Sequence, residues 1–169
     1  MIRKVLVEEA ETLAKLARQT FRETFSYDNT EEQLQSYFSE AYDVQVLVAE
    51  LERPESETYF VEVEGVAVGY LKVNWGKDQT EHELEGAFEI QRLYVLREFQ
   101  GFGLGKQLFE FALECGAQLG ATWAWLGVWE RNIKARNFYE NYGFERFSEH
   151  HFPVGDKIDT DWLLKKKLK

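Results

Sequence analysis

The sequence predicts an α+β (mixed α/β) domain in which helices cover both faces of a central, mixed but mostly antiparallel sheet of seven strands. Three observations support this prediction. Seven segments have the alternation or the composition of strands, and five others have helical spacing or a helix-capping residue. Two of the strands adjoin a tight turn, which indicates antiparallel pairing. A strand–helix–strand unit over residues 88–129 predicts one right-handed parallel crossover.

A short strand and three helices are expected in the first third of the chain. Leu13 and Phe21 belong to an apolar stripe at helical spacing. Thr30 and Gln33 have the spacing of a capping box, which marks the start of a helix. Pro54 disfavours a helical conformation of the residue before it and ends the third helix. The expected elements are a strand over residues 2–7 and helices over residues 8–25, 30–41 and 44–51, the last capped by Asp43.

The remaining two thirds predict six strands and two helices. Glu64 and Gly65 lie between two alternating segments and are expected to form the turn of a hairpin. Leu104, Leu108 and Phe111 begin an apolar helical stripe. The expected elements are strands over residues 59–64, 66–75, 88–95, 121–129, 144–152 and 159–168, and helices over residues 104–119 and 132–141.

Composition excludes several classes of function. The chain has 169 residues, 44% of them apolar, so one domain over residues 1–169 with a sizeable core is expected. The net charge of −10 argues against a nucleic-acid partner, because phosphate binding needs clustered basic residues. No apolar stretch has the length of a signal peptide or a membrane span, so a cytoplasmic protein without a membrane partner is expected. The single cysteine, and histidines without ligand spacing, predict no metal site.

The most informative segment is the glycine-rich stretch 100–106, which lies between an expected strand and the start of an expected helix. Gly101, Gly103 and Gly105 lack a Cβ atom, so the backbone can approach a ligand closely. Free N–H groups at a helix start favour an anion such as a pyrophosphate. The stretch is not a P-loop, because its lysine is not followed by Ser or Thr, and its alternating glycines do not match the dinucleotide fingerprint.

Residues 88–145 resemble the GCN5-related N-acetyltransferase (GNAT) family in two motifs. The first is Gln-x-x-Gly-x-Gly over residues 100–105, and the second is Asn-x-x-Ala-x-x-Phe-Tyr-x-x-x-Gly-Phe over residues 132–144. The resemblance implies the GNAT fold, acetyl-coenzyme A as the cofactor, and a preceding strand whose splayed end faces the thioester. The cofactor-binding residues implied by the preceding strand and the two motifs are Leu93, Tyr94, Val95, Gln100, Gly101, Phe102, Gly103, Leu104, Gly105, Lys106, Asn132, Ala135 and Tyr139.

The resemblance also implies catalytic roles for Tyr139 and Glu89. Tyr139 matches the general acid of the family, and a phenol with a pKa of about 10 can protonate a thiolate whose conjugate acid has a pKa of about 8.5. Tyr142 is a competing candidate for this role. Glu89 occupies a position at which some members carry a general base, acting directly or through water; the alternative is a solvated charge on a strand edge. Cys115 lies on an apolar stripe and is expected to pack in the core.

Two further segments of the chain indicate the chemical class of the acetyl acceptor. Residues 19–29 and 125–132 resemble the PaiA-type spermidine/spermine N-acetyltransferases, which implies a small-molecule amine partner and specifically a polyamine. Alternatives are another amine (an amino acid, an aminoglycoside or a protein N-terminus) and a non-catalytic regulator that binds acetyl-coenzyme A. Because related proteins form dimers, a homodimer is a further expectation. The residues expected to bind the acceptor are Glu23, Trp129 and Glu130, with Asp28 and Glu89 as further acids of a cationic path.

Overall fold

The computed structural model describes residues 1–154 and 156–169, and its seven strands form one sheet in the order β1-β2-β3-β4-β5-β7-β6. All neighbouring strands pair antiparallel except β4 and β5, which are parallel. The expected mixed sheet with one parallel pair is therefore confirmed. The strands are β1 (Ile2–Lys4), β2 (Ser56–Val63), β3 (Val66–Trp75), β4 (Ala87–Val95), β5 (Trp123–Trp129), β6 (Glu145–Val154) and β7 (Lys157–Lys167).

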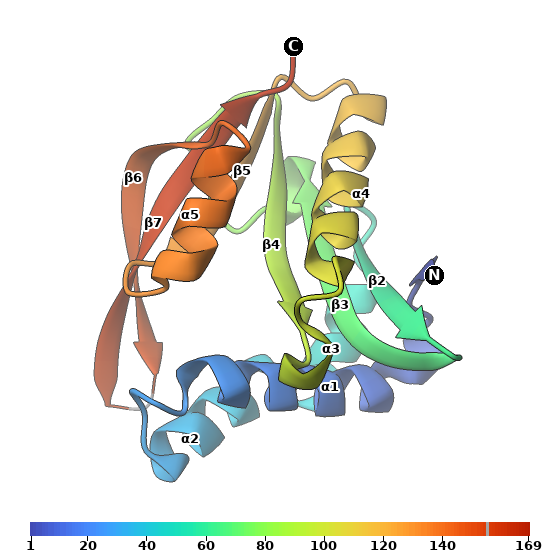
Figure 1. Ribbon diagram of the computed structural model, residues 1–169, viewed down its shortest axis with the longest axis vertical. Coiled ribbons are helices and arrows are strands. Elements are labelled where there is room, and N and C mark those ends of the chain that lie inside the picture. The colour runs from blue at the N-terminus through green and yellow to red at the C-terminus, as the bar shows by residue number, and fades with distance from the viewer. Residues whose placement is uncertain (155) are drawn as a thin grey trace.

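Helices lie on both sides of the sheet. Figure 1 shows α4 and α5 in front of it, α3 behind it, and α1 and α2 along its lower end. The α-helices are α1 (Ala10–Phe25), α2 (Glu31–Ala41), α3 (Val44–Leu51), α4 (Leu104–Gln118) and α5 (Ile133–Asn141). Three 3₁₀-helices that the sequence pattern did not predict are η1 (Val7–Glu9), η2 (Gly76–Asp78) and η3 (Arg97–Phe99). In the described part of the chain, no helix is both long and apolar enough to cross a bilayer.

The local signals in the sequence form the turns and caps that they predict. The Thr30 hydroxyl accepts the Gln33 backbone N–H at 3.1 Å, and the Gln33 side chain accepts the Thr30 N–H at 2.8 Å, so the capping box is present. The Asp43 carboxylate accepts a backbone N–H two residues later at 3.0 Å and begins α3. Glu64 and Gly65 turn the β2–β3 hairpin with φ of 52° and 78°, a left-handed conformation that suits glycine.

The first strand is shorter than predicted. Residues 2–7 were expected as one strand followed by a helix from residue 8, but β1 ends at Lys4 and α1 begins at Ala10. The Glu9 carboxylate accepts both the Leu6 backbone N–H at 3.0 Å and the Arg3 guanidinium at 2.6 Å. These bonds fold the chain back and form the 3₁₀ turn that separates the two elements. At the other end, β6 and β7 extend further toward each other than predicted.

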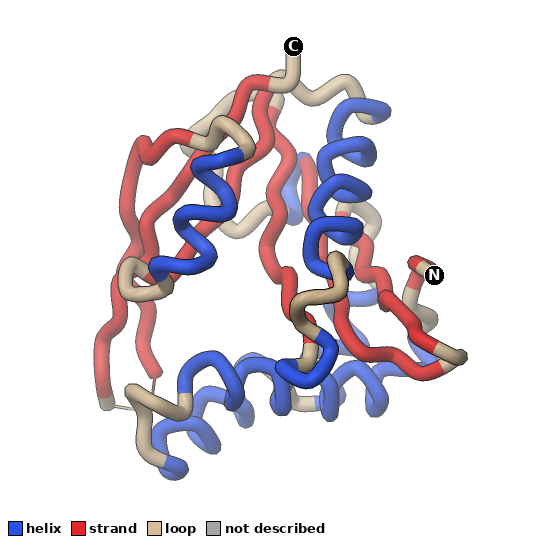
Figure 2. The backbone as a smooth tube through the Cα atoms, in the orientation of Figure 1, coloured by secondary structure: helices blue, strands red, loops and turns tan. Residues whose placement is uncertain are grey.

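The parallel pair β4–β5 is the feature that positions the functional site. Only Ala87–Ile90 and Trp123–Leu126 are paired, and beyond them the two strands separate (Figure 2). The chain immediately after β4 continues into η3 and the glycine-rich loop, and the chain after β5 continues into α5. The opening between the strands is therefore bordered by both of the motifs identified in the sequence.

Candidate active site

Two cavities meet where β4 and β5 separate. The first, here called the glycine-loop groove, has a volume of about 550 Å³ and runs between β4, β5 and the first turns of α4 and α5. The second, here called the acidic cavity, has a volume of about 390 Å³ and lies between α1, α2 and strands β4 to β7. The residues that line both cavities are Phe25, Gln91, Tyr94, Gly127 and Trp129. A molecule bound in one cavity can therefore contact a molecule bound in the other.

The glycine loop is shaped to hold an anion at the start of α4. The Gln100 side chain donates to the Val95 carbonyl at 3.0 Å and fixes the loop to the end of β4. Gly101 and Gly103 have φ of 90° and 82°, which L side chains rarely adopt. At Gly105, in the first turn of α4, a Cβ atom would meet no protein atom within 4 Å. The open surface and the helix dipole favour a phosphate group at this point.

The groove carries a positive set of side chains although the whole chain is acidic. Arg97, Lys106 and Lys134 line it, and Glu23 is the one acid among the described residues that line it. The Glu23 carboxylate accepts the Arg97 backbone N–H at 2.8 Å, so it is occupied at the start of the loop. All of the expected cofactor-binding residues line the groove except Phe102, whose side chain is exposed outside it.

Tyr139 projects from α5 into this groove and packs against three aromatic rings. The ring centroids of Phe109, Phe138 and Phe144 lie 5.3, 5.4 and 6.3 Å from that of Tyr139. Burial raises the pKa of Tyr139 to about 12, so the phenol is protonated at neutral pH. No group in residues 1–154 or 156–169 hydrogen-bonds its hydroxyl, which leaves it available to a ligand.

Tyr142, the competing candidate, lies elsewhere. Its hydroxyl donates to the Glu110 carboxylate at 3.3 Å, and it does not line the groove. Asn132 combines two expected features: its side chain accepts the Ala135 backbone N–H at 3.2 Å as the N-cap of α5, and it lines the groove. Cys115 packs half-buried against the core, and burial raises the pKa of its thiol to about 11, as expected for a structural cysteine.

Glu89 lies in the wall of the acidic cavity and is 3% exposed. Its carboxylate accepts the Asn74 side-chain amide at 2.9 Å, the Thr80 backbone N–H at 2.8 Å and the Thr80 hydroxyl at 2.5 Å. The alternative of a solvated charge on a strand edge is therefore wrong. Three donors occupy about three of the four lone-pair positions of the carboxylate, so one position remains for a water or a substrate.

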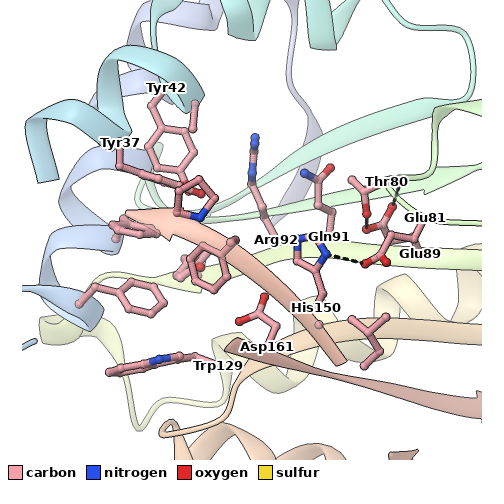
Figure 3. Close-up of a pocket in the computed structure, with 18 of the residues that line it drawn as sticks. Tyr37, Tyr42, Thr80, Glu81, Glu89, Gln91, Arg92, Trp129, His150 and Asp161 are labelled. Carbon is pink, nitrogen blue, oxygen red and sulfur yellow. Dashed lines mark hydrogen bonds and ion pairs between the residues drawn. The ribbon is translucent and has the colours of Figure 1, made fainter. Parts of the chain in front are cut away.

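The acidic cavity combines aromatic rings with carboxylates (Figure 3). Its acids are Glu40, Glu81, Glu89 and Asp161, and its aromatic residues are Phe21, Phe25, Tyr37, Tyr42, Tyr94, Trp125, Trp129 and Phe152. Arg92, whose side chain is 11% exposed, is neutralised by Glu50, with a closest distance of 2.8 Å between them, and His150 lies 3.4 Å from Glu81. Rings supply cation–π surface and carboxylates supply negative charge, so the cavity suits an organic cation.

The three expected acceptor-binding residues do not all line one cavity. Trp129 lines both cavities, but Glu23 lies in the glycine-loop groove and Glu130 lines neither cavity. Asp28 is also absent from both linings, and Lys157 and Arg131 pair with its carboxylate. Hydrogen bonding to Lys157 accordingly lowers the pKa of Asp28. Of the acids predicted to form a cationic path, only Glu89 lines the acidic cavity, where it is joined by the expected substrate-binding residue Trp129.

Sequence reasoning did not select the acids Asp161 and Glu81. The signal for Asp161 is an acidic residue in the interior of a strand, where Asp is disfavoured unless it has a specific role. Glu81 belongs to the acidic loop before β4, whose path across the cavity cannot be read from local spacing.

Comparison with known proteins identifies related chains. Residues 10–144 match the model of the acetyltransferase (GNAT) family. An "uncharacterized N-acetyltransferase in pepI 3'region" of Lactobacillus delbrueckii subsp. lactis is 44% identical over 153 residues, which cover 90% of this chain and 88% of that protein. A spermidine N(1)-acetyltransferase of Thermoplasma acidophilum is 25% identical over 170 residues, covering 98% of this chain and 96% of the relative.

The fold is also found among solved structures. The crystal structure of the PaiA N-acetyltransferase from Thermoplasma acidophilum, determined in complex with coenzyme A, superimposes with a TM-score of 0.81 at 23% identity. The match covers 99% of this chain and 98% of that protein. The arrangement of strands and helices described above is thus shared over nearly the whole length of both chains.

Proposed function

The chain belongs to the acetyltransferase (GNAT) family, and on this premise we propose that it transfers an acetyl group from acetyl-coenzyme A to a primary amine of a small cationic molecule such as a polyamine. The observation that carries the proposal is the junction of the two cavities: a glycine-loop groove with basic side chains opens, at the β4–β5 separation, into a cavity lined by acids and aromatic rings. One cavity suits an anionic donor and the other a cationic acceptor, so the two reactants meet at the junction.

The residues of the groove fit the cofactor. Gly101, Gly103 and Gly105 expose backbone at the start of α4 for the pyrophosphate, and Lys106 and Lys134 add positive charge beside it. Beyond their short parallel pairing, the facing edges of β4 and β5 are not paired with each other and offer backbone groups to the pantetheine arm. When bound, acetyl-coenzyme A supplies an activated thioester whose carbonyl carbon can be attacked directly by an amine.

We assign proton transfer to two side chains. Tyr139, protonated because burial raises its pKa to about 12, donates its proton to the departing sulfur and is the general acid. Glu89 has one open lone-pair position after its three hydrogen bonds and accepts a proton of the amine through an intervening water. The three donors fix the carboxylate in position, so it need not reorganise during the reaction.

A polyamine is favoured over a neutral or anionic acceptor by charge. The acidic cavity carries four carboxylates, whereas its Arg92 is already paired with Glu50. The second cationic nitrogen of a polyamine would therefore be attracted to these carboxylates, whereas the carboxylate of an amino acid would be repelled by them. The spermidine N(1)-acetyltransferase of Thermoplasma acidophilum and a spermine/spermidine N(1)-acetyltransferase of Bacillus subtilis are consistent with this choice.

A thiol-release assay with acetyl-coenzyme A tests the proposal. The purified chain is incubated with spermidine, spermine, monoamines, amino acids, an aminoglycoside and a peptide, and released thiol and acetylated product are both measured. We expect kcat/KM to be highest for spermidine and spermine. A higher value for an amino acid or a peptide would refute the polyamine assignment. Coenzyme A binding without thiol release from any amine would indicate a regulator instead of an enzyme.

A further inference from the structure

Asp161 lies at the junction of the two cavities. It faces Trp129 of β5 and His150 of β6 in the strand pairing, and Figure 3 shows its side chain projecting from β7 into the acidic cavity. A Cβ atom added to Gly127 would come within 3.3 Å of the Asp161 Oδ2 atom. The carboxylate therefore lies directly over Gly127, which lines both cavities just beyond the last residue of β5 that pairs with β4.

The Asp161 carboxylate is open, unlike its neighbours. No donor among the described residues hydrogen-bonds it, and no basic side chain in that part of the chain forms an ion pair with it. Glu89, by contrast, accepts three hydrogen bonds, and Asp159 lies 3.5 Å from the Lys157 amino group. A half-buried carboxylate without a partner is costly, so its retention at a ligand junction points to a partner supplied by the ligand.

The surroundings of Asp161 keep it able to exchange a proton near neutral pH. Burial first, and then the negative charges of Asp159 and Glu81, raise the pKa of Asp161 to about 7. Trp129 and Gly127 of β5 bring no charge, and the phenols of Tyr37 and Tyr94, which are near enough to be affected by it, have pKa values raised by burial and remain neutral. The other titratable or charged side chains that line the same cavity are Glu40, Tyr42, Glu89, Arg92 and His150, and burial raises the pKa of the Tyr42 phenol as well.

We propose that Asp161 binds the ammonium group of the acceptor and accepts its first proton, which makes it a catalytic residue of the transfer reaction. This inference rests on the proposed function. The ammonium gives one proton to Asp161 and becomes a neutral amine, whose nitrogen forms the new C–N bond to the acetyl carbon. The C–S bond breaks, and Tyr139 protonates the sulfur. The nitrogen loses its second proton through water to Glu89, and both carboxyls later release their protons to solvent while the phenol regains its own.

The variant Asp161→Asn tests this role through the pH dependence of kcat/KM. In the wild type, kcat/KM for an alkylamine should rise with pH and level off above an apparent pKa near 7, where Asp161 is ionised. In Asp161→Asn only the free amine reacts, so kcat/KM should keep rising by tenfold per pH unit up to the pKa of the amine. At pH 7 the loss should be on the order of 10²- to 10⁴-fold, since proton transfer by a positioned side chain typically contributes this much.

Two matched measurements separate a proton acceptor from a structural residue. Methoxyamine is neutral at pH 7 and needs no base before attack, so the variant should acetylate it within a few-fold of the wild-type rate. The control Asp159→Asn makes the same substitution two residues away, outside both linings, and removes one of the charges that raise the pKa. In Asp159→Asn the rise of kcat/KM with pH should occur at lower pH than in the wild type, and the plateau value of kcat/KM should stay the same.

A readout without cofactor keeps this test independent of turnover. Carboxyl carbon NMR of the free protein should show a resonance that titrates near pH 7, is missing in Asp161→Asn and shifts when spermidine is added. The amide cannot become charged, so the variant avoids the cost of ionising a buried carboxyl and should be at least as stable above pH 7. A variant profile that levels off like the wild type, or a resonance that does not respond to spermidine, would overturn the proposal. Absence of turnover in the wild type with every amine would refute the proposed function alone.

Discussion

Replacement of Gly105 by alanine separates cofactor binding from stability. Gly105 is the second residue of α4, it does not require a positive φ, and a Cβ atom there would meet no protein atom within 4 Å. Alanine is better than glycine in a helix, so the free energy of unfolding should stay unchanged or rise by up to about 0.5 kcal/mol. In the absence of a ligand, the substitution is therefore not expected to destabilise the fold.

In the groove, however, the added methyl group occupies the surface expected to contact the pyrophosphate. Losing one hydrogen bond to a charged group costs about 1.5–3 kcal/mol, which corresponds to a roughly 10- to 150-fold weaker Kd for coenzyme A. Calorimetric titration of the free protein measures this Kd, and chemical denaturation measures stability. Acetylpantetheine, which has the thioester arm but no pyrophosphate, is the matched control and should bind the variant as it binds the wild type. An unchanged Kd for coenzyme A in a stable Gly105→Ala variant would refute the placement of the pyrophosphate.

Three further predictions address the reaction and the core. Tyr139→Phe keeps the ring packing, so the variant should bind coenzyme A normally in calorimetry. Its kcat in the thiol-release assay should fall by about 10²- to 10⁴-fold, and an unchanged kcat would exclude Tyr139 as the general acid. Glu89→Gln should lower kcat and change its pH profile, and a profile identical to the wild type would exclude a role in proton transfer. Because burial raises the pKa of Cys115 to about 11, the thiolate is only about 10⁻⁴ of the population at pH 7; alkylation by iodoacetamide, followed by mass spectrometry, should be far slower than that of glutathione.

The local elements of the fold could be predicted because short-range chemistry determines them. The capping box at Thr30, the cap at Asp43 and the turn at Glu64 and Gly65 depend on residues within three positions, and all of them form as expected. The predicted end of the first strand was wrong because Glu9, through its bonds to Arg3 and the Leu6 N–H, ends the strand early. A side chain that reaches back over several residues competes with strand pairing, and alternation alone does not reveal this competition.

The two cavities of the candidate site also differed in how far they could be predicted from the sequence. The groove residues lie in two continuous motifs, so their positions follow from local spacing once β4 and α4 are placed. The acidic cavity instead joins α1, α2, the loop before β4 and β7, which are far apart in the sequence. Glu23 was expected there, yet its carboxylate is held by the Arg97 N–H in the groove, whereas Asp161 enters through the register of β7 against β5. Only the three-dimensional pairing of strands determines which acids face the acceptor.

Positive and negative side chains are separated between the two cavities, and the net charge of the chain does not reveal this separation. Lys106 and Lys134 border the groove, whereas the acidic cavity has four carboxylates and one guanidinium that is already neutralised. A polyamine acceptor should accordingly bind more weakly as ionic strength rises, because exposed attractions are screened over roughly 10 Å at 0.1 M salt. An acceptor KM that does not change with salt would mean that the acids do not attract the substrate.

The short β4–β5 pairing makes the sheet resemble two lobes joined along a narrow seam. Strands β1 to β4 form one lobe and β5, β7 and β6 the other, and the groove walls belong to both. A ligand in the groove therefore acts as a clamp across the seam. At 100 times its Kd such a ligand stabilises the native state by about 2.7 kcal/mol. Amide hydrogen exchange at Ala87–Ile90 and Trp123–Leu126 should consequently slow when coenzyme A binds, in backbone that pairs across the seam.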